Sequence, residues 1–141
     1  MSVIPEALLL AKHEATAMHD VTRGGLLETL LEISLLSGVS IEVDASRLPI
    51  LPVVTRFAQA FTFDPLRMIS SGTLAATVPT NSVAKAMDAL NDVGVLSADV
   101  GQVTEGAGVS ILRKGETVRY HTIRCEEDEL ARMWNLYPRN E

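Results

Sequence analysis

Apolar residues recur along the chain with two periods, and the alternation between them predicts an α/β protein. Helical spacing predicts five helices: residues 3–14, residues 25–37, a segment opened by Pro52, a segment opened by residues 79–82, and a segment starting near Glu126. Alternating or continuous apolar runs predict six strands, at residues 15–18, 39–43, 73–78, 98–104, 109–113 and 117–123. This order predicts an α/β sandwich, in the broader α+β sense, with helices that cover a mixed β-sheet.

The helix predicted at residues 25–37 has the strongest apolar pattern. Its apolar residues are Leu26, Leu27, Leu30, Leu31, Ile33 and Leu35. Because they spread over too wide an arc for a helix with one buried face, we expect neighbours on more than one side. Gly38 follows at the position where glycine commonly ends a helix, and the strand at residues 39–43 comes directly after it.

The last third of the chain contains a hairpin and a helix with an acidic start. Lys114 and Gly115 separate two predicted strands, which indicates a tight hairpin. Acidic residues are expected in the first turn of the last helix, where they complement the helix dipole: Glu126, Glu127 and Asp128. The predicted packing face of this helix consists of Leu130, Met133, Trp134 and Tyr137.

Length and composition restrict the class of protein. With 141 residues, 47% of them hydrophobic and 21% charged, the chain suits one globular domain that spans residues 1–141. The net charge is −6 and no basic patch with interleaved aromatic residues is present, which argues against a nucleic-acid partner. The apolar runs are too short to span a membrane, no signal peptide is recognisable, and the single cysteine suits a reducing compartment. We therefore expect a cytoplasmic protein without a membrane partner.

The stretch at residues 17–26 is the leading candidate for binding chemistry. It passes from a predicted strand through a glycine-containing turn into a helix, and Thr22 is expected to cap that helix through its side-chain oxygen. Gly24 and Gly25 allow a ligand to approach the backbone, and the first amides of the helix favour an anion. Arg23 adds a planar cation that suits phosphate or carboxylate. The turn is therefore a candidate phosphate site; the alternative is a capped turn whose glycines serve packing.

A second small polar turn, at Ser70, Ser71 and Gly72, precedes another predicted strand. If both turns lie along one edge of the sheet, their hydroxyls and amides converge on one anionic ligand. The alternative, which we favour for Ser70 and Ser71 taken individually, is a plain turn before a strand. His19 and Asp20 adjoin the first turn, and because neighbouring strand residues point to opposite faces, we expect only one of them to contact the ligand.

No motif in the sequence indicates a metal site. HExxH, CxxC and paired histidines at ligand spacing are all missing, so we predict no metal bound by this chain alone. Cys125 is followed by carboxylates that disfavour a reactive thiolate, so we do not assign it a catalytic role. Glu105 is expected at an exposed hairpin position.

The stretch at residues 17–26 resembles the signature that opens the C-terminal domain of the AIR synthase-related superfamily. The similarity continues in the same order through residues 37–42, 64–66, 72–74 and 101–106. The superfamily includes aminoimidazole ribonucleotide synthase, selenophosphate synthetase, thiamine monophosphate kinase and the hydrogenase-maturation dehydratase. The residues here are most similar to the last of these.

The resemblance implies the fold of that C-terminal domain and a role in an ATP-dependent enzyme. In the superfamily, an N-terminal domain carries most of the ATP and metal ligands and forms the dimer, and ATP lies in the cleft between the domains. The residues implied to face this cleft are His19, Asp20, Thr22, Arg23, Gly24 and Gly25. The resemblance therefore implies ATP and Mg²⁺ in the complete enzyme, with no cofactor held tightly by this chain alone.

Three departures from the family pattern qualify what the resemblance implies. The sequence analysed contains no stretch that resembles the N-terminal domain, it ends in Tyr137 to Glu141 and not in the reacting cysteine, and Ser71 occupies a position that tends to be acidic in the hydrogenase-maturation enzymes. We therefore expect a relative with related ATP chemistry, inactive alone, whose partner is an ATP-binding domain from the same gene or a separate chain. A homodimer is a further expectation.

Two alternatives without catalysis remain open. One is a free-standing module that binds a phosphorylated metabolite, and the other is a structural domain that self-associates. Neither requires an ATP-binding partner, and the sequence does not identify a substrate.

Overall fold

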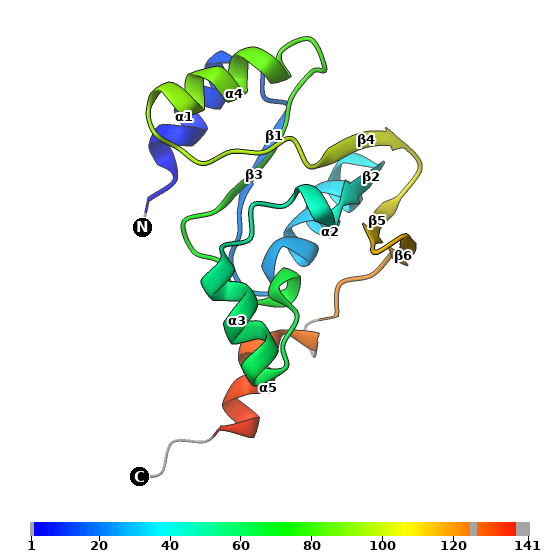
Figure 1. Ribbon diagram of the computed structural model, residues 1–141. Helices are drawn as coiled ribbons and strands as arrows, with labels where there is room; N and C mark the ends of the chain where they lie inside the picture. Colours follow the sequence, from blue (N-terminus) through cyan, green and yellow to red (C-terminus); the bar gives the residue numbers. More distant parts are fainter. Residues whose placement is uncertain (1, 125–126, 138–141) are drawn as a thin grey trace.

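The computed structural model describes residues 2–124 and 127–137, and its elements follow the predicted order (Figure 1). The helices are α1 (Ile4–Lys12), α2 (Gly25–Ser37), α3 (Pro52–Phe61), α4 (Val83–Asp92) and α5 (Glu129–Leu136). The strands are β1 (Ala17–Asp20), β2 (Val39–Asp44), β3 (Leu74–Thr77), β4 (Gly101–Glu105), β5 (Gly108–Arg113) and β6 (Glu116–Tyr120). Two 3₁₀ turns, η1 (Ala45–Arg47) and η2 (Pro65–Arg67), flank α3. The predicted α/β architecture is confirmed.

The strands form two sheets, which the sequence pattern did not distinguish. Strands β1 and β3 form an antiparallel ladder, and the other four form a sheet in the order β4-β2-β5-β6. In that sheet β2 and β5 run parallel, while the β2–β4 and β5–β6 pairs are antiparallel. The predicted mixed sheet is therefore present, with the β1–β3 ladder separate from it.

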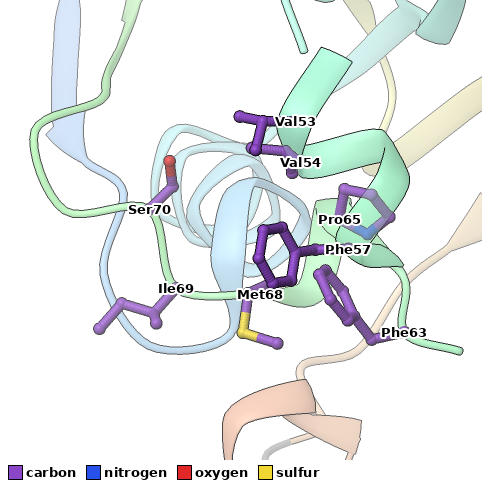
Figure 2. Close-up of a pocket in the computed structure, with 8 residues that line it drawn as sticks. All are labelled: Val53, Val54, Phe57, Phe63, Pro65, Met68, Ile69 and Ser70. Atoms are coloured by element: carbon purple, nitrogen blue, oxygen red, sulfur yellow. The ribbon is translucent and has the colours of Figure 1, made fainter. Parts of the chain in front are cut away.

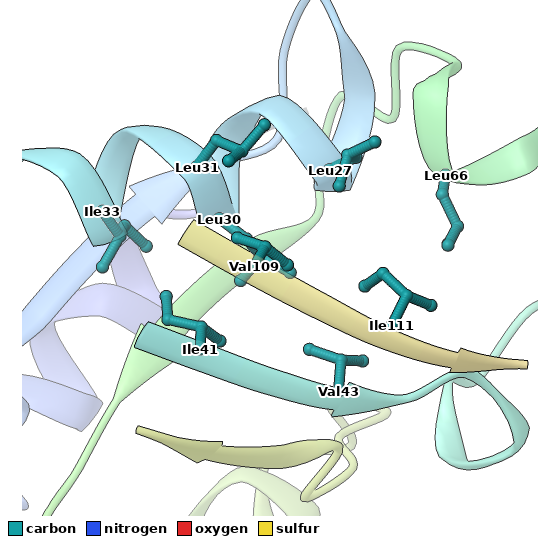
Figure 3. Close-up of a cluster of buried hydrophobic side chains, with 9 residues drawn as sticks. All are labelled: Leu27, Leu30, Leu31, Ile33, Ile41, Val43, Leu66, Val109 and Ile111. Atoms are coloured by element: carbon teal, nitrogen blue, oxygen red, sulfur yellow. The ribbon is translucent and has the colours of Figure 1, made fainter. Parts of the chain in front are cut away.

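Helix α2 lies on one face of the mixed sheet and forms the main core with it (Figure 3). Alternate residues of the two central strands point toward the helix, as period-two patterning requires. The buried side chains are Leu27, Leu30, Leu31 and Ile33 from α2, Ile41 and Val43 from β2, Val109 and Ile111 from β5, and Leu66 from η2. The prediction that α2 has neighbours on more than one side is confirmed, because β1, β3 and η2 also contact it.

The apolar residues near the C-terminal end of α2 are less buried than predicted. Leu35 is 48% exposed, and Leu36 is 88% exposed on the side opposite the buried stripe that contains Leu31. Gly38 adopts a left-handed conformation with φ of 66° and ends the helix, as predicted.

Helices α1 and α4 pack against each other beside β3, at the upper end of the view in Figure 1. Leu10, Ala86 and Leu90 are the buried centre of this second cluster, and Leu74 of β3 packs against it. Ala76 on the same strand is exposed, although the strand predicted at residues 73–78 is a nearly continuous apolar run of the kind that two covered faces favour. The ladder has only two strands, and its second face is not fully covered.

The C-terminal helix begins later than predicted. Asp128 is its N-cap, with Oδ1 accepting a hydrogen bond of 3.0 Å from the Leu130 amide, while Glu126 lies outside the described residues. Trp134 is 68% exposed, so the prediction that it lies on the packing face of this helix was wrong. Tyr137 is largely exposed and meets Phe61 edge-on, with ring centroids 5.7 Å apart.

The predicted hairpin at Lys114 and Gly115 is confirmed. Both residues have positive φ, 53° and 85°, as a tight two-residue connection between twisted strands requires. Across residues 2–124 and 127–137, none of the helices combines the length and apolarity that crossing a bilayer would need.

Replacing Leu31 with alanine should strongly destabilise the domain. Leu31 is 2% exposed at the centre of the α2–sheet core, so its truncation leaves a cavity and should lower the free energy of unfolding by about 2–5 kcal/mol. The matched control on the same helix is Leu36→Ala, which should change it by less than about 0.5 kcal/mol because Leu36 is exposed. Urea denaturation of both variants measures the difference, and equal losses would contradict the assigned face of α2.

Candidate functional site

The β1–β3 ladder brings the two candidate turns to the same end of the molecule. Asp20 pairs with Leu74, and beyond this pair the Val21 amide donates a hydrogen bond of 2.8 Å to the Thr73 carbonyl. Val21 is fully buried, which anchors the chain as it leaves β1. Residues 21–25 and 70–73 are therefore neighbours, although nearly fifty positions separate them in the sequence.

The first turn is a tight strand-to-helix connection held by its own backbone. The Gly25 amide donates to the Thr22 carbonyl at 3.1 Å, and Gly24 is the N-cap with φ of 80°. No side chain caps α2, so the prediction that Thr22 caps this helix was wrong. The reason is positional: the helix begins at Gly25, two residues beyond Arg23, where a helix capped by Thr22 would begin. The Thr22 side chain is instead exposed.

Gly25 is required by the packing of its own chain. A Cβ at Gly25 would lie 2.5 Å from the Leu66 carbonyl oxygen and 2.8 Å from that of Met68. Its φ of 69° also disfavours any side chain. The backbone from Leu66 to Met68 lies against Gly25, which is the contact that the packing alternative expects, and a phosphate role for the turn stays a prediction.

Arg23 is bound to a carboxylate of the same chain. Its Nε donates to Oδ2 of Asp128 at 2.6 Å, and the Asp128 side chain is 1% exposed. The other oxygen of Asp128 caps α5, so the Arg23–Asp128 pair ties the glycine turn to the start of that helix. The guanidinium remains 70% exposed, which leaves it accessible from solvent. No local pattern predicts this partner, because 105 positions separate the two residues.

His19 and Asp20 are neighbours on β1 that differ in burial, and their side chains come within 3.7 Å of each other, from His19 Nδ1 to Asp20 Oδ1. His19 is half-buried and engaged at both ring nitrogens, with Nε2 at 2.7 Å from Oε2 of Glu32 and Nδ1 at 2.7 Å from the Asp20 carbonyl. Asp20 is exposed beside the turn. The histidine therefore links β1 to α2 through Glu32, and whether it contacts a ligand stays a prediction.

The second turn is closed by its own hydrogen bonds. The Thr73 amide donates to the Ser70 carbonyl at 3.0 Å, and the hydroxyls of Ser70 and Thr73 are 2.8 Å apart. Gly72 has φ of 94°, and both Ser71 and Gly72 are exposed. Ser70 thus has the structural role that the plain-turn alternative gives it, while Ser71 and Gly72 face solvent next to the first turn.

An apolar hollow of about 350 Å³ adjoins the second turn (Figure 2). Its lining is Val53, Val54 and Phe57 from α3, and Phe63, Pro65, Met68, Ile69 and Ser70 from the chain that follows. Figure 2 shows the Ser70 hydroxyl as the only polar side-chain group among these residues. The hollow therefore offers apolar contact and no charge.

Glu28 is the residue that sequence reasoning missed. It is 8% exposed, and its Oε1 has no hydrogen-bond partner among the described residues. Burial raises the pKa of the Glu28 carboxyl above its ordinary value, and the carboxylates of Asp128 and Glu32 add to this effect. The guanidinium groups of Arg67 and Arg23 act in the opposite direction. The available signal was an acidic residue, Glu28, that lies between leucines of the apolar arc of α2.

The Glu28 side chain lies against the glycine turn and determines what that turn can bind. A Cβ on Gly24 would fall 1.9 Å from Oε2 of Glu28, so Gly24 leaves room for this carboxylate. An ionised carboxylate at a helix N-terminus opposes the binding of a second anion there. Among the described residues, no group of three or more potential ligands is arranged to hold a metal ion. Cys125 lies outside those residues.

Comparison with known proteins gives consistent results. The family described as AIR synthase related protein, C-terminal domain, matches residues 1–114. Carbamoyl dehydratase HypE of Escherichia coli is 30% identical over 97 residues, which are 67% of this chain and 29% of the relative. The corresponding protein of Cupriavidus necator is 42% identical over 59 residues, covering 42% of this chain and 17% of the relative. The chain thus spans less than a third of the length of these curated relatives.

Solved structures show the same fold. The crystal structure of E. coli HypE, a hydrogenase maturation protein, superposes with a TM-score of 0.77 at 27% identity, covering 85% of this chain and 39% of that one. A structure of hydrogenase maturation protein HypE in complex with ATP gives a TM-score of 0.72 at 23% identity, covering 81% and 38%. The predicted similarity to the AIR synthase-related superfamily, and to HypE within it, is confirmed.

Replacing Gly25 with alanine should destabilise the domain more than the same change at Gly38. Both glycines have positive φ, 69° and 66°, so both variants carry the backbone penalty of about 1–2 kcal/mol. A Cβ at Gly38 meets nothing within 4 Å, whereas at Gly25 it collides with backbone, which should add about 1–3 kcal/mol. Chemical denaturation compares the two variants, and equal losses would show that η2 does not pack against this turn.

Replacing Glu28 with glutamine should stabilise the domain at neutral pH. Since folding raises the pKa of this carboxyl, the ionised form is disfavoured in the native state, and the cost is present above the native pKa. The gain in unfolding free energy should therefore be largest near pH 7 and disappear below the ordinary value of 4.5. Denaturation across pH 4 to 8, with the exposed Glu42→Gln as control, measures this. A loss of stability at pH 7 would contradict the buried environment assigned to Glu28.

Proposed function

Because the chain belongs to the AIR synthase related family, as a C-terminal domain, we propose that it forms one wall of the cleft of an ATP-dependent, HypE-like enzyme. The observation that supports this most directly is the family match across residues 1–114. The relatives are more than three times longer than the matched segment, and one structural neighbour was solved in complex with ATP. The proposal makes the domain inactive alone.

In this proposal the two turns contact the phosphate groups of the nucleotide or of a phosphorylated substrate. The contacts come from the exposed guanidinium of Arg23, the Thr22 hydroxyl, and the Ser71–Gly72 segment on the neighbouring turn. Arg23 is already paired with Asp128, and Glu28 lies against Gly24, so the positive charge available to a phosphate is small. Further cations must come from elsewhere, which is the physical reason to expect weak binding by this domain alone.

ATP and Mg²⁺ in the complete enzyme would be held mainly by the partner domain. The carboxylates around the glycine turn do not form a metal site within the part of the chain that the structure describes. Asp128 is bound to Arg23 and caps α5, and Glu32 is bound to His19. This chain would therefore supply phosphate contacts and apolar surface, while the partner supplies the metal ligands.

The partner is proposed to be an ATP-binding domain, encoded by the same gene or on a separate chain in the cytoplasm. The apolar face of α3 suits such a contact, because Val53 and Phe57 are 53% and 54% exposed beside the hollow of Figure 2. One structural neighbour is a HypE–HypF complex, so proteins of this fold do assemble with other chains. The same exposed face favours self-association as the second candidate, a structural module or homodimer without catalysis.

The phosphate role of the turn can be separated from its structural role with two variants. Arg23→Ala and Asp128→Asn both break the ion pair, and asparagine still caps α5. Only Arg23→Ala removes the cation, so it should weaken binding of ATP–Mg²⁺ to the assembly with the ATP-binding domain by about tenfold or more. Asp128→Asn should leave the affinity unchanged or higher.

Isothermal titration calorimetry on the assembly measures both affinities, and urea denaturation reports the stability that the variants share. If both variants bind ATP–Mg²⁺ like the parent assembly, Arg23 has only a structural role. If both lose affinity in proportion to lost stability, the turn acts through folding, and the proposed phosphate contact is wrong.

A further inference from the structure

A second cavity, of about 370 Å³, lies between α2, η2 and the chain that follows β6. Its charged lining consists of Glu28, Arg67, Arg119, His121, Arg124 and Glu127. The volume falls in the range of sites for small molecules. The cavity is distinct from the apolar hollow of Figure 2, with which it shares no lining residue.

The α2 side of this cavity lacks a hydrogen-bond donor. The Glu28 side chain is more than nine-tenths buried, with 8% exposure, and its Oε1 accepts no hydrogen bond from residues 2–124 or 127–137. A buried carboxylate oxygen without a partner costs free energy, which a donor brought by a ligand would recover. Four charged groups act on the Glu28 carboxyl. The carboxylates of Asp128 and Glu32 raise its pKa, and the guanidinium groups of Arg67 and Arg23 lower it.

The opposite side of the cavity has an excess of positive charge. Glu127 accepts from Arg67 at 2.6 Å and from Arg124 at 3.0 Å, so one carboxylate is shared between two guanidinium groups. Arg119 makes no side-chain hydrogen bond or ion pair with any residue of the described chain. Arg67 also lies over the Tyr120 ring at 5.5 Å, which fixes its orientation. On this side of the cavity, three arginines and only one carboxylate, Glu127, favour the binding of an anionic group of a ligand.

We propose that this cavity binds a small dipolar ligand, with an ammonium group against Glu28 and a phosphate or carboxylate against Arg119 and Arg124. A simple anion does not satisfy the site, because it leaves Oε1 of Glu28 without a donor. A simple cation leaves the arginines without an anion. The ligand must therefore carry both groups, and the chemistry is that of an amino acid or an amino-alkyl phosphate.

This inference goes beyond the proposed function, since it requires neither ATP nor a partner domain. It uses residues of this chain only, and its test is carried out on the chain by itself. Failure here would leave the phosphate role of Arg23 unaffected, and failure of the ATP proposal would leave this cavity unaffected.

Calorimetric titration with 2-aminoethyl phosphate and with β-alanine tests the proposal. At least one of them should bind with a dissociation constant below about 10 mM. It should also bind at least tenfold more tightly than analogues with charge of one sign only, which are ethyl phosphate and propionate for the anion and ethylammonium for the cation. If neither dipolar probe binds, or if the analogues bind equally well, the proposal is wrong.

Two pairs of variants assign the binding to the two sides of the cavity. Glu28→Gln should weaken binding of the dipolar probe by about tenfold. Glu42→Gln should leave the binding unchanged, because Glu42 is exposed on β2 and does not line the cavity. Arg119→Ala should weaken it similarly, with Arg47→Ala in η1 as its control. Because Glu28→Gln is expected to be more stable than the parent at pH 7, a loss of binding is not attributable to unfolding. Binding that both Glu28→Gln and Arg119→Ala leave unchanged would place the probe elsewhere.

Discussion

The contact between the first turn of α2 and the backbone of η2 determines much of the structure around it. Gly25 allows this approach because a Cβ would collide with the carbonyl oxygens of Leu66 and Met68. The contact places Leu66 in the core below α2 and Arg67 at the charged cavity. It also directs the chain through the apolar hollow and into the turn at Ser70. A small residue at one position thus permits the close packing of η2 on α2, beside which both cavities lie.

Electrostatics then limit what the glycine turn can do by itself. Helix N-termini and arginines favour phosphate, but Arg23 is paired with the buried Asp128 and Glu28 lies against Gly24. An anion at this turn has to compete with two carboxylates of the same chain. A partner domain that brings further cations would change this balance, which agrees with a chain that covers 29% of the E. coli relative.

The sequence was sufficient for the elements with strong local signals. The bounds of α2, its end at Gly38 and the hairpin at Lys114 follow from apolar spacing and backbone preference, which act over a few residues. The sequence could not show whether the two turns lie next to each other. The β1–β3 register shows that they do. Whether these turns bind phosphate stays a prediction.

What the sequence could not provide depends on pairing between distant segments. The division into two sheets, the Arg23–Asp128 pair and the packing of η2 on Gly25 each join residues more than forty positions apart, for which no local pattern exists. The assignment of a cap to Thr22 failed by a small shift in the helix start, and Trp134 is exposed although its spacing suits a packing face. The burial of Glu28 was not predicted because an acidic residue between leucines of a wide apolar arc forms no motif.

The most direct test of the cleft-domain account is the binding of ATP–Mg²⁺ to this chain alone and to the chain assembled with its ATP-binding domain. That domain would be identified from the intact mass of the native gene product, or by pull-down if the native product has this length. The account predicts no measurable binding or ATP hydrolysis by the chain alone, and both activities in the assembly. Tight ATP binding by the chain alone, or an assembly that gains neither activity, would contradict it.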